Sequence, residues 1–173
     1  MNNRFFLKLA ASNNNDQAFF ELGILYFNGK YVQKDIKKSI EYITLAASKN
    51  NILAQNFLGV HYIKGQIVNQ DFNKAIYYLT LAANQKEPSS ASDLSLIYYN
   101  GIYVPRDINK FIYFATIASN QNNVESQYNL GCLYIEGKYI ARDIKKAIYY
   151  FTLAANQNHL ESLHQLGVIY TDA

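Results

Sequence analysis

Three histidines and one cysteine are the residues of this chain best suited to metal binding or nucleophilic chemistry: His61, His159, His164 and Cys132. A zinc site needs several such ligands at short, characteristic spacings, and the sequence has neither an HExxH motif nor a Cys/His cluster. His61 also stands where equivalent stretches carry leucine or isoleucine, which predicts a histidine packed in a core. We therefore expect no metal, no cofactor and no enzymatic activity that depends on these residues.

Four aspartates recur every 36 residues, at Asp35, Asp71, Asp107 and Asp143. A catalytic carboxylate is needed once, whereas an identical position in every copy favours a structural role as the N-cap of a helix. The sequence contains no G-x(4)-G-K-[ST] or G-x-G-x-x-G motif for phosphate and no G-x-S-x-G motif for a nucleophilic serine. The lysine pairs at 37–38 and 145–146 are interpreted as solvated helix surface.

The elements that position these residues follow the same 36-residue period from residue 17 to residue 170. Each full repeat has a Leu-Gly pair (Leu94-Ser95 in the third), a second glycine, the aspartate and a closing pair of small residues. In the fourth repeat these are Leu130-Gly131, Gly137, Asp143 and Ala154-Ala155. The second glycine predicts the left-handed end of a first helix, and the aspartate predicts the start of a second helix. A period of this length, held this strictly, indicates a solenoid of helix pairs.

The pattern therefore predicts an all-α chain with two helices in each repeat. First helices are expected at 17–28, 53–64, 89–100, 125–136 and 161–171, and second helices at 4–12, 36–48, 72–84, 108–120 and 144–156. We expect one repeat domain over residues 1–173, with full repeats at about 17–52, 53–88, 89–124 and 125–160 and partial repeats at 4–16 and 161–173. The third repeat departs most, because Ser95 replaces the glycine, Phe111 takes a small-residue position and Ser119 replaces an alanine.

The pattern A-x(3)-L-G-x(2)-Y-x(2)-G-x(5)-D-x(2)-K-A-x(6)-A-A resembles the Sel-1-like repeat family, which is related to the tetratricopeptide repeats. The fourth repeat matches it at Leu130, Gly131, Tyr134, Gly137, Asp143, Lys146, Ala147, Ala154 and Ala155, and departs at Ser126, which replaces alanine. The resemblance covers essentially the whole chain. It implies a right-handed superhelix of antiparallel helix pairs that acts as an adaptor in protein complexes, without indicating one partner.

The composition narrows the class of protein further. The 173 residues include one cysteine, have a formal net charge of +3 and contain no apolar run of about 18 residues. We interpret the N-terminus as helix and not as a signal peptide, and we expect a cytoplasmic location and no membrane partner. The leading function is a non-enzymatic protein-interaction scaffold. The alternatives are a regulatory segment of a larger, enzyme-fused protein and a single-stranded nucleic-acid-binding solenoid, which the evenly spread positive charge argues against.

The first helices are expected to line the concave side of the array and to bind the partner. At about 100° per residue, positions two before, two after and five after each Leu-Gly leucine point away from the core. With neighbouring charged residues they form the predicted binding surface: Phe20, Ile24, Phe27, Asn56, Val60, Ile63, Lys64, Ser92, Leu96, Tyr99, Glu125, Tyr128, Cys132, Ile135, Glu136, Glu161 and His164.

The charge of this surface changes sign along the array, from Lys64 to Glu125, Glu136 and Glu161. We therefore expect a partner peptide or helix with apolar anchors and a basic end. The last helix has no following repeat to cover Leu163, Leu166 and Tyr170, so we expect these side chains to be covered by a longer parent chain or by end-to-end self-association.

Overall fold

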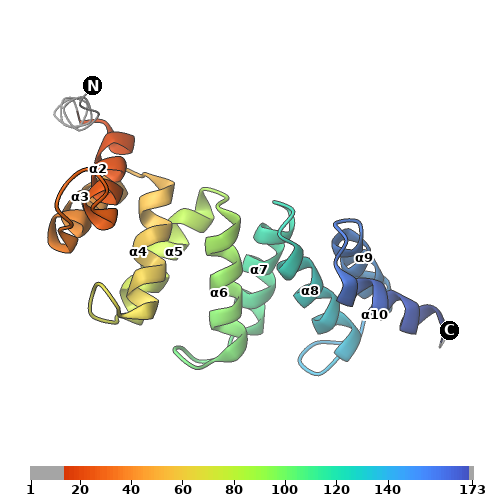
Figure 1. Ribbon diagram of the computed structural model, residues 1–173. Helices are drawn as coiled ribbons and strands as arrows, with labels where there is room; N and C mark the ends of the chain where they lie inside the picture. Colours follow the sequence, from red (N-terminus) through yellow and green to blue (C-terminus); the bar gives the residue numbers. More distant parts are fainter. Residues whose placement is uncertain (1–13, 172–173) are drawn as a thin grey trace. The chain divides into compact units, whose positions relative to one another are not determined.

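The computed structural model describes residues 14–171, and within that range the chain forms helices and no strands (Figure 1). Contacts between residues divide the chain into two compact units, residues 1–85 (unit 1) and 86–173 (unit 2). Unit 1 contains α2 (Asp16–Asn28), α3 (Ile36–Ser48), α4 (Ile52–Lys64) and α5 (Phe72–Asn84). Unit 2 contains α6 (Pro88–Asn100), α7 (Ile108–Ser119), α8 (Val124–Glu136), α9 (Ile144–Ala155) and α10 (Leu160–Thr171).

These bounds confirm the predicted helices from residue 17 onwards, because no end differs from its prediction by more than one residue. The predicted helix 4–12, and with it most of the partial repeat 4–16, lies outside the described residues. Consecutive helices pack against each other, α2 to α5 in unit 1 and α6 to α10 in unit 2, and the two helices of one repeat make the most extensive contacts. The all-α repeat architecture is therefore confirmed.

The recurring glycine and aspartate fix the loop between the two helices of a repeat. Gly137 has a φ of 63°, the left-handed conformation that ends α8 without a Cβ clash. Asp143 caps α9, because its carboxylate accepts a hydrogen bond from the Lys146 N–H at 3.0 Å. The Asp143 N–H donates to the Tyr134 carbonyl at 2.9 Å, which ties the loop to the end of α8. Aspartates 35, 71 and 107 make the same bonds in their repeats, so the predicted capping role is confirmed.

The first helix of each repeat begins at a cap that was not predicted. Asn50 takes the left-handed conformation with a φ of 71°, and the Asn51 side chain accepts a hydrogen bond from the Ala54 N–H at 2.9 Å. Asparagine suits both positions, since it tolerates positive φ and its side-chain oxygen can bond a free N–H. The equivalent capping residues are Asn15, Glu87, Asn123 and His159.

The two helices of a repeat approach most closely at the glycine of the Leu-Gly pair. A Cβ atom on Gly131 would lie 2.5 Å from Cε1 of the buried Phe151, and a Cβ atom on Gly59 would lie 2.6 Å from Cγ of the buried Leu79. Both distances are too short for real carbon atoms, so a larger residue fits only if its neighbour moves. Glycine is therefore required here by packing against the second helix.

In the other full repeats a glycine on the first helix faces a large side chain on the second, and the third repeat differs at both positions. Ser95 replaces the glycine, and Ala115 takes the position that Phe151 and Leu79 hold in other repeats. The side-chain volume lost at Ala115 is restored one helical turn earlier, where Phe111 replaces the serine or alanine of the other repeats. Ser95, Ala115 and Phe111 are all buried, so the departures noted in the sequence are a compensated exchange within one core.

Candidate protein-binding surface

The residues best suited to chemistry do not gather in one place within the described range. No group of three or more His, Cys, Asp or Glu side chains there is placed to hold a metal ion. His61 packs with its ring 4.2 Å from the Phe57 ring and 5.7 Å from the Phe27 ring, which confirms the packed histidine. Its buried Nδ1 has no hydrogen-bond partner among the described residues, and burial, followed by the charge of Lys64, lowers the pKa of His61.

In unit 1 part of the predicted surface packs between helices. Phe20 and Ile24 of α2 pack against the apolar cluster of α3 and α4. Phe27 meets Phe57 edge-on, with ring centroids 5.4 Å apart. Asn56, Val60 and Ile63 of α4 are half-buried, and Lys64 is exposed. Phe20 and Ile24 also line an open pocket of about 290 Å³ on α2, so part of the predicted surface of unit 1 remains accessible.

In unit 2 the prediction that Ser92 lies on the surface is wrong. Its side chain is only 8% exposed, and its hydroxyl accepts a hydrogen bond from the Ser126 hydroxyl at 3.2 Å. Small residues let α6 and α8 approach closely at this point, so the two serines pair across the helices and leave no surface for a partner. A rotation of about 100° per residue gives the direction of a side chain on its own helix but takes no account of the helix beside it.

The next part of the same surface opens into a pocket between α6 and α8. Its volume is 290 Å³, and it brings together four predicted residues: Leu96 and Tyr99 of α6, and Cys132 and Glu136 of α8. Leu96 is 38% exposed. Three lining residues were not predicted: Asn100 of α6, Asn129 of α8 and Phe111 of the second helix α7. The buried Phe111 ring lies 5.1 Å from the Tyr99 ring and forms an aromatic wall with it.

Two polar side chains that line this pocket, Tyr99 and Cys132, have pKa values above their ordinary ones. Burial, with a smaller contribution from the Glu136 charge, raises the pKa of Tyr99. Burial also raises the pKa of the Cys132 thiol, which makes it a poor nucleophile. A hydrogen bond with Cys132 raises the pKa of Tyr128 to about 12. The pocket is thus suited to contact with apolar groups and carries one charged residue, Glu136.

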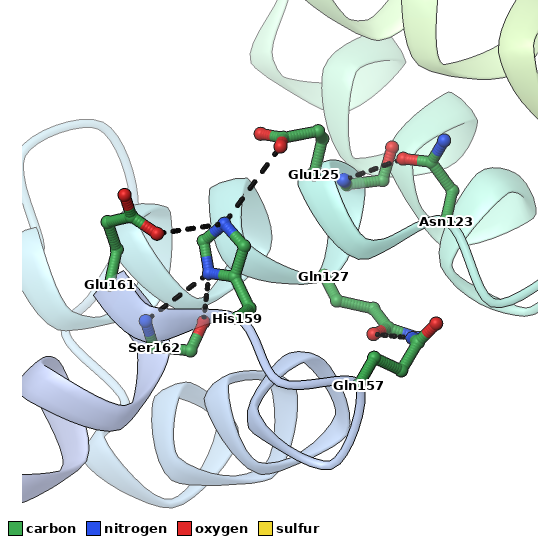
Figure 2. Close-up of polar contacts among 8 residues, drawn as sticks. Asn123, Glu125, Gln127, Gln157, His159, Glu161 and Ser162 are labelled. Atoms are coloured by element: carbon green, nitrogen blue, oxygen red, sulfur yellow. Dashed lines mark hydrogen bonds and ion pairs between the residues drawn. The ribbon is translucent and has the colours of Figure 1, made fainter.

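At the N-terminal ends of α8 and α10, two glutamates converge on His159 (Figure 2). His159 Nε2 lies 3.4 Å from Oε2 of Glu161 and 3.9 Å from Oε1 of Glu125, while the Ser162 N–H donates to Nδ1 at 3.3 Å. The histidine is the cap of α10 and its side chain is only 13% exposed, whereas the two glutamates are 70% and 66% exposed. Both carboxylates therefore remain accessible to a partner.

The Tyr128 ring packs next to His159, with its ring centroid 4.9 Å from the His159 ring and 5.8 Å from the Phe151 ring. Tyr128 is thus partly structural, although it was predicted as a binding residue. The other predicted residues are separate from this cluster: Ile135 is half-buried on α8, and His164 is exposed on α10. Of the three α10 side chains expected to need cover, Leu163 and Tyr170 are exposed and Leu166 is half-buried.

Nine short helices in the described range, paired by repeating loops, define an α-helical repeat protein of the solenoid class. The model of the Sel1 repeat matches residues 17–51, 52–87, 88–123 and 124–159. The chain therefore belongs to the Sel1 repeat family, whose proteins are generally scaffolds for protein interaction. None of the curated proteins compared with it matches significantly.

Solved structures with the same repeats resemble the chain over most of its length. A protective antigen present in uropathogenic Escherichia coli strains is 29% identical to this chain, with a TM-score of 0.88. The match covers 98% of this chain but only 36% of the antigen's length. A Sel1 repeat protein from Oxalobacter formigenes is 30% identical with a TM-score of 0.81, covering 96% of this chain and 68% of its own. Helicobacter pylori cysteine rich protein B, at 24% identity and a TM-score of 0.57, covers 79% of this chain and 98% of its own and shares the fold. None of the described helices of the present chain is long and apolar enough to cross a membrane.

Proposed function

We propose that the chain is a non-enzymatic scaffold that binds a segment of a partner protein on the first helices of unit 2. The partner segment inserts apolar side chains between α6 and α8 and places a basic end near the N-termini of α8 and α10. Either an extended peptide or a helix can present side chains in this way.

The pocket lined by Leu96, Tyr99, Phe111 and Cys132 is the observation that carries the proposal. An aliphatic side chain, two aromatic rings and a neutral thiol form a concave apolar site, and such sites bind the anchor residues that dominate interface energies.

The acidic pair gives the proposed partner its direction. Glu125 and Glu161 project from α8 and α10, and His159 lies between them. A lysine or arginine of the partner would place a positive charge beside two exposed carboxylates. Such rim contacts contribute more to association rate and specificity than to affinity.

Amide hydrogen exchange on the full chain bound to its captured partner tests the proposal. The partner is first isolated by affinity purification, and its binding segment is mapped with overlapping peptides. We expect slower exchange in α6, α8 and α10, and unchanged exchange in the second helices α7 and α9. Protection confined to α7 and α9 would refute the proposed surface.

A further inference from the structure

The space beside the first helices is filled differently in the two units. In unit 1 the Phe57 ring of α4 packs edge-on against Phe27 of α2, at 5.4 Å, and lies 4.2 Å from His61. Two repeats later the position of Phe27 is held by Tyr99, again aromatic, but the position of Phe57 is held by Asn129. The short amide does not replace the ring, and the 290 Å³ pocket lies at this position in unit 2.

The lining of the pocket matches an aromatic side chain. Tyr99 supplies the ring that Phe27 supplies in unit 1, Leu96 supplies an aliphatic wall, and Phe111 fills the bottom where unit 1 has only Ser39. An edge-on contact between two rings is among the arrangements that aromatic pairs prefer. Phe57 is thus an internal example of the group that this position accepts.

The charge at the edge of the pocket indicates what lies next to that ring. Glu136 lines the pocket and is exposed, where the equivalent residue in unit 1 is Lys64. Glu136 forms no ion pair with another described residue. The neighbouring Arg106 donates its hydrogen bonds to neutral acceptors, the Tyr99 carbonyl and the Tyr139 hydroxyl at 2.7 Å each, so it stays cationic but does not pair with Glu136. A cation beside the aromatic anchor would therefore find an available carboxylate.

We infer that the pocket between α6 and α8 binds an aromatic side chain of the partner that is followed by a basic residue. This inference rests on the proposed function and specifies its anchor: the partner supplies the ring that Phe57 supplies internally in unit 1. The chain thereby has one position of the repeat closed by its own side chain and the equivalent position two repeats later open to a ligand.

A titration with capped dipeptide amides tests the inference on the full chain. The probes are acetyl-Phe-Arg-amide, acetyl-Ala-Arg-amide, which lacks the ring, and acetyl-Phe-Glu-amide, which reverses the charge. ¹H–¹⁵N NMR spectra follow the amides of Leu96, Cys132 and Glu136. We expect saturable shifts with the first probe, about tenfold weaker binding or more without the ring, and about two- to fivefold weaker binding with the reversed charge.

The variant Asn129→Phe places a ring of the chain itself in the pocket, as Phe57 does in unit 1. We expect it to remain folded and to lose the response to acetyl-Phe-Arg-amide. Should it fail to fold, Leu96→Gln removes an exposed wall of the pocket and is expected to weaken the same response at least fivefold. The inference is overturned if the three probes act alike, if no shift saturates, or if a folded Asn129→Phe chain responds as the wild type does.

Failure of this inference can be told apart from failure of the proposed function. A partner that binds wild-type and Asn129→Phe chains equally, but still protects α6 and α8 from exchange, would overturn the aromatic pocket alone. A partner that protects only the second helices would overturn the proposed function, while the dipeptide titration would still decide whether the pocket accepts a ring.

Discussion

Exchanging glycine for serine at the closest helix contact provides a sharp test of how these repeats pack. In Gly131→Ser the new Cβ would lie 2.5 Å from Cε1 and 2.6 Å from Cδ1 of Phe151, a ring that is fully buried. Crowding of this kind in a packed core costs about 1–3 kcal/mol, and the better helix propensity of serine returns about 0.5 kcal/mol. We expect Gly131→Ser to lower the free energy of unfolding of unit 2 by about 0.5–2.5 kcal/mol.

The third repeat indicates how that loss can be reversed. It combines Ser95 with the small Ala115 at the equivalent positions, so serine is tolerated where the facing residue is small. Phe151→Ala alone is expected to cost about 3–5 kcal/mol. In Gly131→Ser/Phe151→Ala the clash is absent, so the double variant should be about 1–3 kcal/mol more stable than the sum of the single changes predicts.

Gly167 supplies a matched control for this cycle. It belongs to the Leu-Gly pair of α10, but no atom lies within 4 Å of a Cβ built on it. Gly167→Ser should therefore be neutral or slightly stabilising, by about 0.5 kcal/mol. Urea unfolding followed by circular dichroism, with hydrogen exchange of α8 amides to isolate unit 2, measures all four variants. Equal stability of Gly131→Ser and Gly167→Ser, or additivity in the double variant, would refute the packing argument.

Three further changes test the core, the caps and the acidic surface. Burial lowers the pKa of His61 below the usual 6.5, so the folded chain binds this proton less tightly than the unfolded chain and loses stability as the pH falls below 6.5. His61→Leu should remove this loss of stability. Its urea midpoint should therefore exceed that of the wild type at pH 5, with a smaller difference at pH 8. Asp143→Ala should cost about 1 kcal/mol of unfolding free energy through the lost cap of α9, and Asp143→Asn clearly less, with equal losses in both variants arguing against the cap. Glu125→Lys with Glu136→Lys should weaken partner binding several-fold at low salt and much less at high salt, measured by calorimetry at two ionic strengths, and a salt-independent loss would contradict an electrostatic role.

The helices could be predicted closely because their ends depend on local chemistry. Glycines with positive φ and capping aspartates act within a few residues of their own position, so their spacing fixes both ends of a loop. The caps of the first helices obey the same local rule and could have been found from the Asn-Asn pairs at 14–15, 50–51 and 122–123, which recur in phase with the repeat. Glu87 and His159 vary from that pattern and hide it.

The site was predicted less well because it depends on neighbouring helices. Ser92 is buried by its pairing with Ser126, and the bottom of the pocket comes from Phe111, a residue of a second helix. The convergence of His159 on two glutamates joins α8 and α10 and has no signal in the spacing of either helix alone. Periodicity places a side chain on its helix, whereas the surface that remains open depends on the sizes of side chains on the neighbouring helices.

The role of the first helices as the binding surface is tested most directly by two matched leucine substitutions. Leu96 lines the pocket on α6 and is 38% exposed, and Leu45 lies on the second helix α3 and is 45% exposed. Truncation of either leucine to alanine should leave the chain folded, as circular dichroism will verify. We predict that Leu96→Ala weakens binding of the mapped partner segment about fivefold or more in calorimetry, while Leu45→Ala leaves the Kd unchanged. A Kd that rises with Leu45→Ala and not with Leu96→Ala would contradict the proposed scaffold surface.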